Sequence, residues 1–198
     1  MMTSARKLVF LLSFVILSCN SPSTNNIDEI VSILGRTMGT TYSVKYTTGI
    51  KNNDDIKENK NKIEEILRNV NMQMSTYIPE SEISQFNRMR NTEWVNISED
   101  FAFVVQSSFE YYKMSGGLYD VTVMPLVNLW GFGPDKFIDT PSTTNIDSVL
   151  AFVGQDLIEI ESGRIRKKDS RVQIDLSSIA KGFAVDKIIE SLNSVSYT

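Results

Sequence analysis

The segment 172–182 changes its hydrophobic period in the middle, and this change constrains the fold more than any other feature of the chain. Apolar and polar residues alternate over 172–176 as in a strand, and a helical pattern then begins, with Ser177 as its expected N-cap. Asp175 stands at the junction, and Lys181 follows in the first turns of the helix. Acid, base and helix-start amides together suit an anionic ligand with a cation. Read alone, the same unit also fits a carboxylate that caps a helix beside a solvated lysine.

The rest of the chain predicts helices mixed with short strands. An amphipathic pattern predicts one helix over 54–74, and a second helix starts after Ser98 and stops at Gly116-Gly117. A shorter helix is expected over 146–153. Strands are expected over 41–47, 157–161, 164–167 and 172–176. This mixture of helices and antiparallel strands predicts the α+β class.

Composition excludes several kinds of site. The chain has 198 residues and a net charge of −4, with acidic and basic residues interspersed, so it has no electrostatic footprint for nucleic acid. It contains no histidine, which excludes histidine triads, histidine bases and histidine metal ligands within these residues. A metal bound here would therefore be a hard cation held by oxygen, such as Mg²⁺ or Ca²⁺.

The N-terminus has the pattern of an exported lipoprotein. Arg6 and Lys7 precede an apolar run over 8–17, and the single cysteine, Cys19, ends a segment that is similar to a bacterial lipobox. We expect residues 1–18 to be a signal peptide and residues 19–34 to be the lipid-anchored cysteine and a polar tether, with the domain on the extracytoplasmic side of a membrane. An uncleaved N-terminal anchor is the alternative, and it places the domain on the same side.

Two segments offer contacts for a ligand. Two glycines bracket Met38 in the segment 35–41, which suits a loop whose backbone approaches a ligand closely, or else an ordinary turn with Met38 in the core. Tyr77 precedes a proline turn and is suited to stacking on an aromatic ligand, or else to burial with its hydroxyl satisfied. The residues alone leave both alternatives open at each position.

The segment 116–134 is the densest in unusual residues. It opens with two glycines, carries Asp120 in an apolar setting, and closes with aromatic residues between glycines at 130–133. A buried carboxylate needs a partner, which is either a ligand or the backbone of its own turn. The pattern does not decide between these two for Asp120.

Taken in order, these segments closely resemble the ApbE family. The resemblance rests on the motifs Met38-Gly39-Thr40, Met74-Ser75-Thr76-Tyr77, Tyr119-Asp120-Val121-Thr122 with Pro125–Gly133, and Ile174-Asp175-Leu176 with Ala180-Lys181-Gly182. It covers the chain from about residue 35 to the end. Members are FAD:protein FMN transferases, typically extracytoplasmic bacterial lipoproteins, so the resemblance implies an ApbE-like (T-fold-like) α+β fold for residues 35–198.

The resemblance also implies roles for particular residues. The positions that match the family's FAD contacts are Met38, Tyr77, Leu118, Tyr119, Asp120, Asp175 and Lys181. Ser178 matches the position whose backbone carbonyl binds Mg²⁺. The family splits FAD at its pyrophosphate, passes FMN to a Thr or Ser hydroxyl of a target protein and releases AMP, and some members mainly hydrolyse FAD. No catalytic residue is assigned.

One departure from the family pattern is expected to matter. Members continue through a His-Ile-Ile-Asp-Pro-like motif and then a segment that supplies Asp and Thr ligands to Mg²⁺, and neither is found up to Thr198. We therefore expect residues 35–198 to be the N-terminal portion of the transferase domain, with a fold incomplete at its C-terminus. The alternatives to a transferase are a lipoprotein that binds or hydrolyses FAD, and an inactive truncated remnant.

Overall fold

The structure is a computed structural model that describes residues 29–48, 52–134 and 140–193. Its elements in chain order are β1 (Glu29–Thr37), β2 (Thr40–Thr48), α1 (Asn53–Met74), α2 (Glu82–Arg88), β3 (Val95–Asn96), α3 (Glu99–Met114), η1 (Val121–Val123), α4 (Met124–Leu129), α5 (Thr143–Leu150), η2 (Gln155–Leu157), β4 (Ile158–Glu161), β5 (Arg164–Lys167) and α6 (Ser177–Asn193). The predicted α+β class is confirmed. Cys19 and the lipobox lie outside the described residues, among which no helix is long and apolar enough to cross a membrane.

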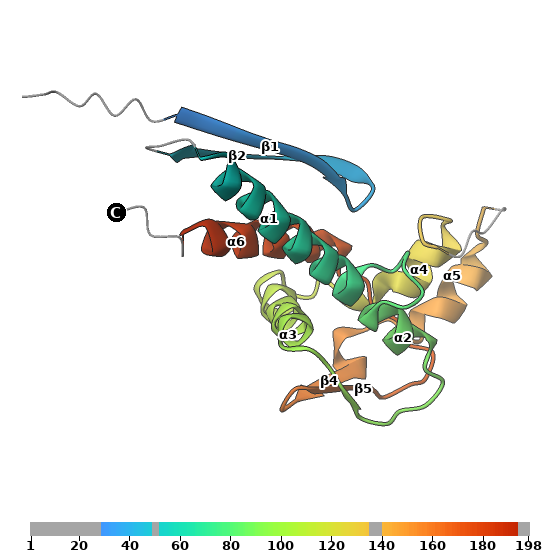
Figure 1. Cartoon of the computed structure of the whole chain (residues 1–198). Helices are drawn as coiled ribbons and strands as arrows, with labels where there is room; N and C mark the ends of the chain where they lie inside the picture. Colours follow the sequence, from blue (N-terminus) through green and yellow to red (C-terminus); the bar gives the residue numbers. More distant parts are fainter. Residues whose placement is uncertain (1–28, 49–51, 135–139, 194–198) are drawn as a thin grey trace, which may run out of the picture.

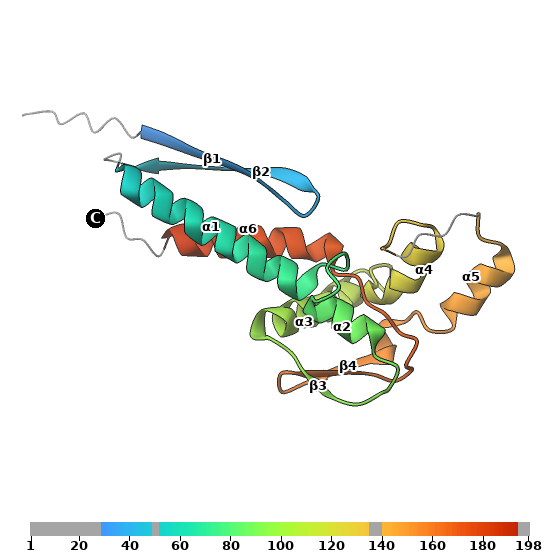
Figure 2. The same ribbon diagram turned by 45° about the vertical axis from the view of Figure 1, so that its right-hand side comes forward.

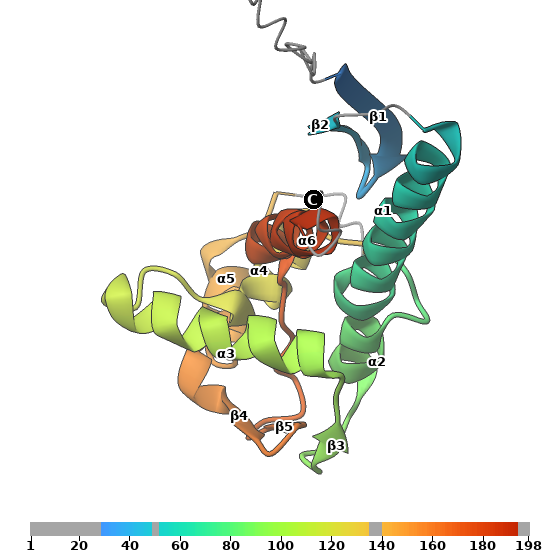
Figure 3. The ribbon, with the colours of Figure 1, turned by 60° about the vertical axis from the view of Figure 1, so that its left-hand side comes forward.

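The elements are stacked around the pair formed by α1 and α6. The β1–β2 hairpin covers one side of this pair, and α3 crosses on the opposite side (Figures 1 and 3). The small antiparallel sheet, in the order β3–β5–β4, lies beyond α3. The core between these layers is a single cluster, and its fully buried side chains include Ile63, Phe101, Val105, Ile165 and Ile174.

The hairpin begins earlier than the sequence suggests. Residues 29–34, predicted as part of the tether, belong to β1, which pairs in register with β2 from Glu29–Thr48 to Thr37–Thr40. Val31 and Ile33 are buried, while polar and apolar neighbours face outward. The sequence prediction missed this strand because a polar run precedes it and Gly35 lies within it, and both features are typical of a linker.

The two long helices form where the amphipathic pattern predicts them. Asn52 caps α1 by accepting a hydrogen bond from the amide of Asp54, and Ser98 caps α3 by accepting one from the amide of Phe101. The helix α3 stops before Gly116 and Gly117, both of which have a positive φ. The predicted helix over 146–153 is shifted, because Ser142 forms a capping box that starts α5 at Thr143.

The segment 172–176 is extended but is not a strand, which corrects the sequence prediction. Its residues alternate between buried and half-buried as expected. However, a side chain stands where a neighbouring strand would pair with it. The Asn87 amide donates to the Ile174 carbonyl and accepts from the Ile174 amide, each at 2.8 Å. On the other side, the Asp175 amide donates to the Val121 carbonyl at 2.7 Å.

Lys167 is buried, and the groups that accept hydrogen bonds from its ammonium are backbone carbonyls rather than a carboxylate. Its side chain is 1% exposed, and its ammonium donates to the carbonyls of Asn87 and Met89 at 3.2 and 3.1 Å. Burial, with a smaller contribution from Arg90, lowers the pKa of Lys167 to about 8. The protonated form is therefore costly in the folded chain.

We predict that Lys167 makes the protein more stable as the pH rises from about 8 to about 10.5, because the unfolded chain then holds the proton that the folded chain has lost. This contribution has a slope of up to about 1.4 kcal/mol per pH unit. Urea unfolding of the wild type and Lys167→Met at several pH values measures it. Lys168→Met, at the half-exposed neighbour, is the control. Equal slopes for wild type and Lys167→Met would contradict the prediction.

Candidate functional site

The ends of three structural elements meet at one end of the α1–α6 pair. The tip of the β1–β2 hairpin, the C-terminal end of α1 and the N-terminal end of α6 all lie toward α4 (Figures 1 and 2). One side-chain contact joins the first two, because the Asn71 amide donates to the Thr37 hydroxyl at 2.9 Å. Most of the predicted site residues lie in this region.

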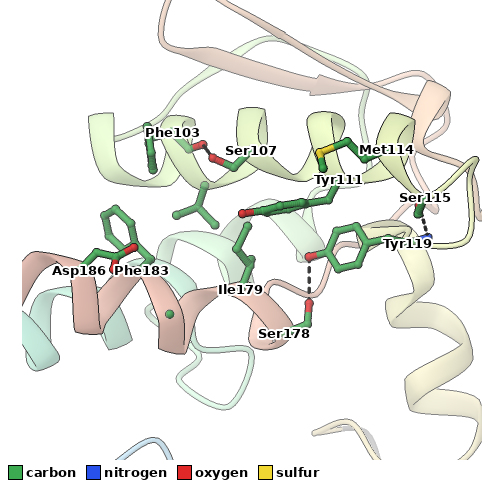
Figure 4. A pocket seen from close by; sticks show the side chains of 12 residues that line it. Phe103, Ser107, Tyr111, Met114, Ser115, Tyr119, Ser178, Ile179, Phe183 and Asp186 are labelled. Carbon is green, nitrogen blue, oxygen red and sulfur yellow. Dashed lines mark hydrogen bonds between the residues drawn. The ribbon is translucent and has the colours of Figure 1, made fainter.

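The first hollow in this region, which we call the aromatic groove, lies between α3 and α6 and has a volume of about 680 Å³. Its walls include Phe103 and Tyr111 from α3 and Phe183 from α6, and Gly182 leaves part of the α6 wall without a side chain. Tyr119 and Ser178 close one end, where the two hydroxyl groups are hydrogen bonded at 2.9 Å (Figure 4).

Tyr119 is held in this position from two directions. Its backbone amide donates to the Ser115 hydroxyl at 2.9 Å, and its ring meets Tyr111 edge-on with 5.8 Å between centroids (Figure 4). Edge-to-face pairs of this kind hold both rings in place. The groove therefore presents fixed aromatic faces with hydroxyl groups at one end.

The second hollow, which we call the apolar cleft, lies between the hairpin and α6 and has a volume of about 410 Å³. Met38 and Tyr42 line it from the hairpin, Ile188 lines it from α6, and the lysines Lys45 and Lys181 also belong to its lining. Burial raises the pKa of the Tyr42 hydroxyl, which stays neutral at physiological pH. The cleft thus combines apolar walls with positive charge.

Met38 adopts an unusual backbone conformation at the hairpin turn. Its φ is 48°, and the following Gly39 has a φ of 72°. Two-residue hairpin turns require positive φ at both positions, which usually selects Asn or Gly at the first. A methionine there carries a conformational cost of about 1–2 kcal/mol. The expectation of a loop before the first strand is therefore corrected to a tight turn between β1 and β2 that points Met38 at the cleft.

The carboxylate of Asp120 is used within the protein. One oxygen accepts hydrogen bonds from the amide and the hydroxyl of Thr122 at 2.7 and 2.6 Å, and the other accepts from the Gln155 amide at 3.0 Å. Of the two alternatives left by the sequence, the structure matches a turn cap that also ties η1 to η2. The carboxylate therefore serves the fold first, whether or not it also reaches a ligand.

Asp175 caps the start of α6 in place of Ser177. The Asp175 carboxylate accepts from the Ser177 amide at 2.7 Å, and Ser177 is the first residue of the helix, which corrects the expected cap. Ser178 and Lys181 follow one turn apart, with Ser178 at the aromatic groove and Lys181 at the apolar cleft. The first turns of α6 therefore form a wall shared by both hollows.

Tyr77 and Leu118 are exposed. Tyr77 is 67% exposed, so the alternative of a buried tyrosine is excluded, although its hydroxyl does donate to the Phe132 carbonyl, at 2.7 Å. Leu118 is 93% exposed. Both residues stand outside the two hollows described above.

Comparisons with known proteins agree on one family. Residues 38–198 match the model of the ApbE family. The chain is 40% identical over 173 residues to an FAD:protein FMN transferase of Haemophilus influenzae, covering 84% of this chain and 50% of that protein. For the Vibrio cholerae enzyme of the same name the identity is 38%, covering 94% of this chain and 55% of that protein.

This chain belongs to the ApbE family. A solved flavin transferase ApbE from Vibrio cholerae superposes with a TM-score of 0.80 at 38% identity, over 84% of this chain and 54% of that chain. The Pseudomonas stutzeri flavinyl transferase ApbE gives a TM-score of 0.79 at 32% identity. The predicted ApbE-like fold is thus confirmed, and the chain spans about half the length of the curated relatives it matches.

The described part of this ApbE-family chain does not gather metal-binding side chains into one cluster. It contains no group of three or more carboxylate, cysteine or histidine side chains placed to hold a metal ion. The backbone carbonyl of Ser178 can supply one oxygen ligand, whereas Mg²⁺ takes near-octahedral oxygen coordination. A metal bound here would therefore need further oxygen ligands from backbone, water or other parts of the protein.

The sequence did not identify the side chains that line the aromatic groove from α3. Tyr111 and Met114 lie on the exposed side of an amphipathic helix and are 47% and 80% exposed. The hydrophobic pattern of the helix therefore did not mark them as core residues. Large apolar residues on the polar face of a helix are the signal that would have found them.

We predict that Asp120→Ala lowers the free energy of unfolding by about 1–3 kcal/mol, because three donors lose their acceptor. Urea unfolding measures this loss. Asp147→Ala, at an exposed position of α5, changes the net charge equally and serves as the control. Equal stabilities for the two variants would show that the carboxylate is not a cap.

Proposed function

We propose that this chain forms the flavin-binding part of an enzyme that transfers FMN from FAD to a Thr or Ser hydroxyl of a target protein. In this reaction the hydroxyl oxygen bonds to the phosphorus of the FMN unit and the bond to the AMP unit breaks. AMP leaves with the bridging oxygen, and the hydroxyl proton passes to water. Membership of the ApbE family, with relatives named FAD:protein FMN transferase, supports the proposal.

The observation that carries the proposal is the shared wall formed by α6. FAD has two planar ring systems joined by a pyrophosphate, and the first turns of α6 separate an aromatic groove from an apolar cleft. The positive end of the α6 dipole and the charge of Lys181 attract phosphate, whereas the Ser177 amide is already bonded to the Asp175 carboxylate. We place the pyrophosphate near Ser178 and Lys181, with the ring systems reaching to either side.

The side chains in this region suit such a ligand. Lys181 and Lys45 supply positive charge at the cleft, Tyr119 offers a fixed ring and a hydroxyl at the groove, and Met38 is held at the tip of the turn. Asp120 holds its loop in place and contacts FAD through its backbone. Tyr77, tied to Phe132, covers the flavin from outside the two hollows. Leu118 and Asp175 complete the proposed set.

We propose that magnesium takes part in the reaction, with the Ser178 carbonyl as one ligand and the others from outside the described residues. When bound, Mg²⁺ would neutralise charge that develops on the pyrophosphate. The contribution of this chain is to bind and orient FAD beside that position.

We further propose that the protein is anchored to a membrane through a lipid on Cys19 and works on the extracytoplasmic side of the bacterial envelope. The charged segment, apolar run and lipobox at the N-terminus support this location. Its macromolecular partner is then a secreted or membrane-bound protein that accepts the flavin.

We predict that bacterial cells that express the protein and are grown with a radioactive fatty acid label the wild type and not Cys19→Ser.

The central experiment uses the purified chain in three steps. Titration with FAD should quench flavin fluorescence, and riboflavin should bind more weakly because it lacks the phosphates. FAD, Mg²⁺ and an acceptor protein with a Thr are then combined, and the acceptor is examined for covalent flavin and the solution for AMP. Free FMN with AMP and an unlabelled acceptor would instead favour FAD hydrolysis, and failure to bind FAD would overturn the proposal for this chain.

We predict that Lys181→Ala weakens FAD binding by about tenfold, because one ammonium group facing the phosphates is lost. The loss should shrink as salt is added, since salt screens exposed charges. Fluorescence titration at low and high salt measures both effects. Lys57→Ala, at an exposed position of α1, is the control. Similar affinities for the two variants would remove Lys181 from the site.

A further inference from the structure

The short helix α2 is tied by side chains to segments far apart in the sequence. At its N-terminal end, the hydroxyls of Ser81 and Ser84 both donate to the Ser75 carbonyl, at 2.6 and 3.2 Å. The carboxylate of Glu82 accepts from the amide and the hydroxyl of Ser98, each at 2.7 Å. Thus α2 fixes both the loop that leads to Tyr77 and the start of α3.

Asn87 makes the third connection, from the last turn of the same helix. Its side chain is 5% exposed and bonds to both the amide and the carbonyl of Ile174, at 2.8 Å each. A primary amide carries an acceptor and a donor side by side, so it pairs with one residue of an extended chain as a neighbouring strand would. This pairing selects Ile174 over its neighbours.

The backbone of Asn87 is itself held in place. The buried ammonium of Lys167 donates to the Asn87 carbonyl at 3.2 Å and lies 5.0 Å from the centre of the Phe86 ring. A charge-assisted bond in a buried setting restrains its acceptor strongly. The side-chain amide of Asn87 therefore binds Ile174 from a residue whose own backbone is restrained.

Ile174 directly precedes the residues proposed to surround FAD. Asp175 caps α6 and donates its amide to Val121, while Ser178 bonds to Tyr119, so the two halves of the site are joined just after the Asn87 contact. A slip of one residue at Ile174 would turn Asp175 inward and rotate the start of α6.

We propose that Asn87 is a positioning residue for the flavin site, acting through Ile174 to set the register of the segment that carries Asp175 and Ser178. This inference rests on the proposed function for its effect on flavin binding. It does not need that function for its effect on the structure, because the register can be measured in the free protein.

The sharpest test is Asn87→Asp. An ionised carboxylate accepts from the Ile174 amide but repels the Ile174 carbonyl, whereas a protonated carboxyl donates and accepts as the amide does. At about pH 8 we expect FAD affinity to fall about tenfold relative to wild type, with faster amide exchange over 172–181. At about pH 5 both should return toward wild type, because burial and the facing Ile174 carbonyl favour the protonated carboxyl more than the Lys167 ammonium favours the ionised form.

Asn59→Asp is the matched control, because Asn59 is another buried asparagine and its side chain donates to the Tyr46 hydroxyl on β2 rather than to Ile174. It should lower stability without a pH-dependent change in FAD affinity or in exchange over 172–181. If Asn87→Asp fails to fold at either pH, Asn87→Ser removes both bonds without adding charge and should show the same loss of affinity and protection.

The outcomes separate the two proposals. If wild type fails to bind FAD, the proposed function fails, and exchange over 172–181 alone decides the role of Asn87. If wild type binds FAD and Asn87→Asp matches it in affinity and exchange at about pH 8, Asn87 is not a positioning residue. If affinity falls at both pH values to the same extent as stability, its role is structural only.

Discussion

The extended segment that leads into α6 is held in place by hydrogen bonds to a side chain. In a sheet, a neighbouring strand would provide these bonds. The amide of Asn87 pairs with both backbone groups of Ile174, and Val121 receives the next amide on the opposite side. Buried backbone groups must be paired, so this contact lets an extended segment cross the core without a ladder. The positions of Asp175 and the first turn of α6 follow from it.

The fold uses its polar residues mainly to join elements rather than to line a cavity. Asp120 binds its own turn and η2, Glu82 accepts from Ser98, the cap of α3, across a sequence gap of 16 residues, and Lys167 donates to the carbonyls at the end of α2. Each of these groups is satisfied by backbone partners, which is the condition for placing polar groups in a core. What remains for a ligand is then largely aromatic faces, hydroxyls, backbone and a few exposed ammonium groups.

This arrangement supports the proposal that this part of the protein binds and orients FAD. The described residues bring aromatic walls, a helix N-terminus and lysines to one region, without a cluster of metal-binding side chains. Binding an extended ligand on two sides of one helix fixes its pyrophosphate at the helix start. Orientation of this kind supplies much of the rate in phosphoryl transfer.

The sequence by itself determined the long helices, the Ser98 cap and the family, because hydrophobic period, a capping serine and ordered motifs are local signals. It did not find β1, whose pairing depends on β2, or the extended state of 172–176, whose partner is a side chain 87 residues away. It also left open the role of Asp120. Only the tertiary structure decided these points, since a polar group's partner is set by what the fold brings beside it.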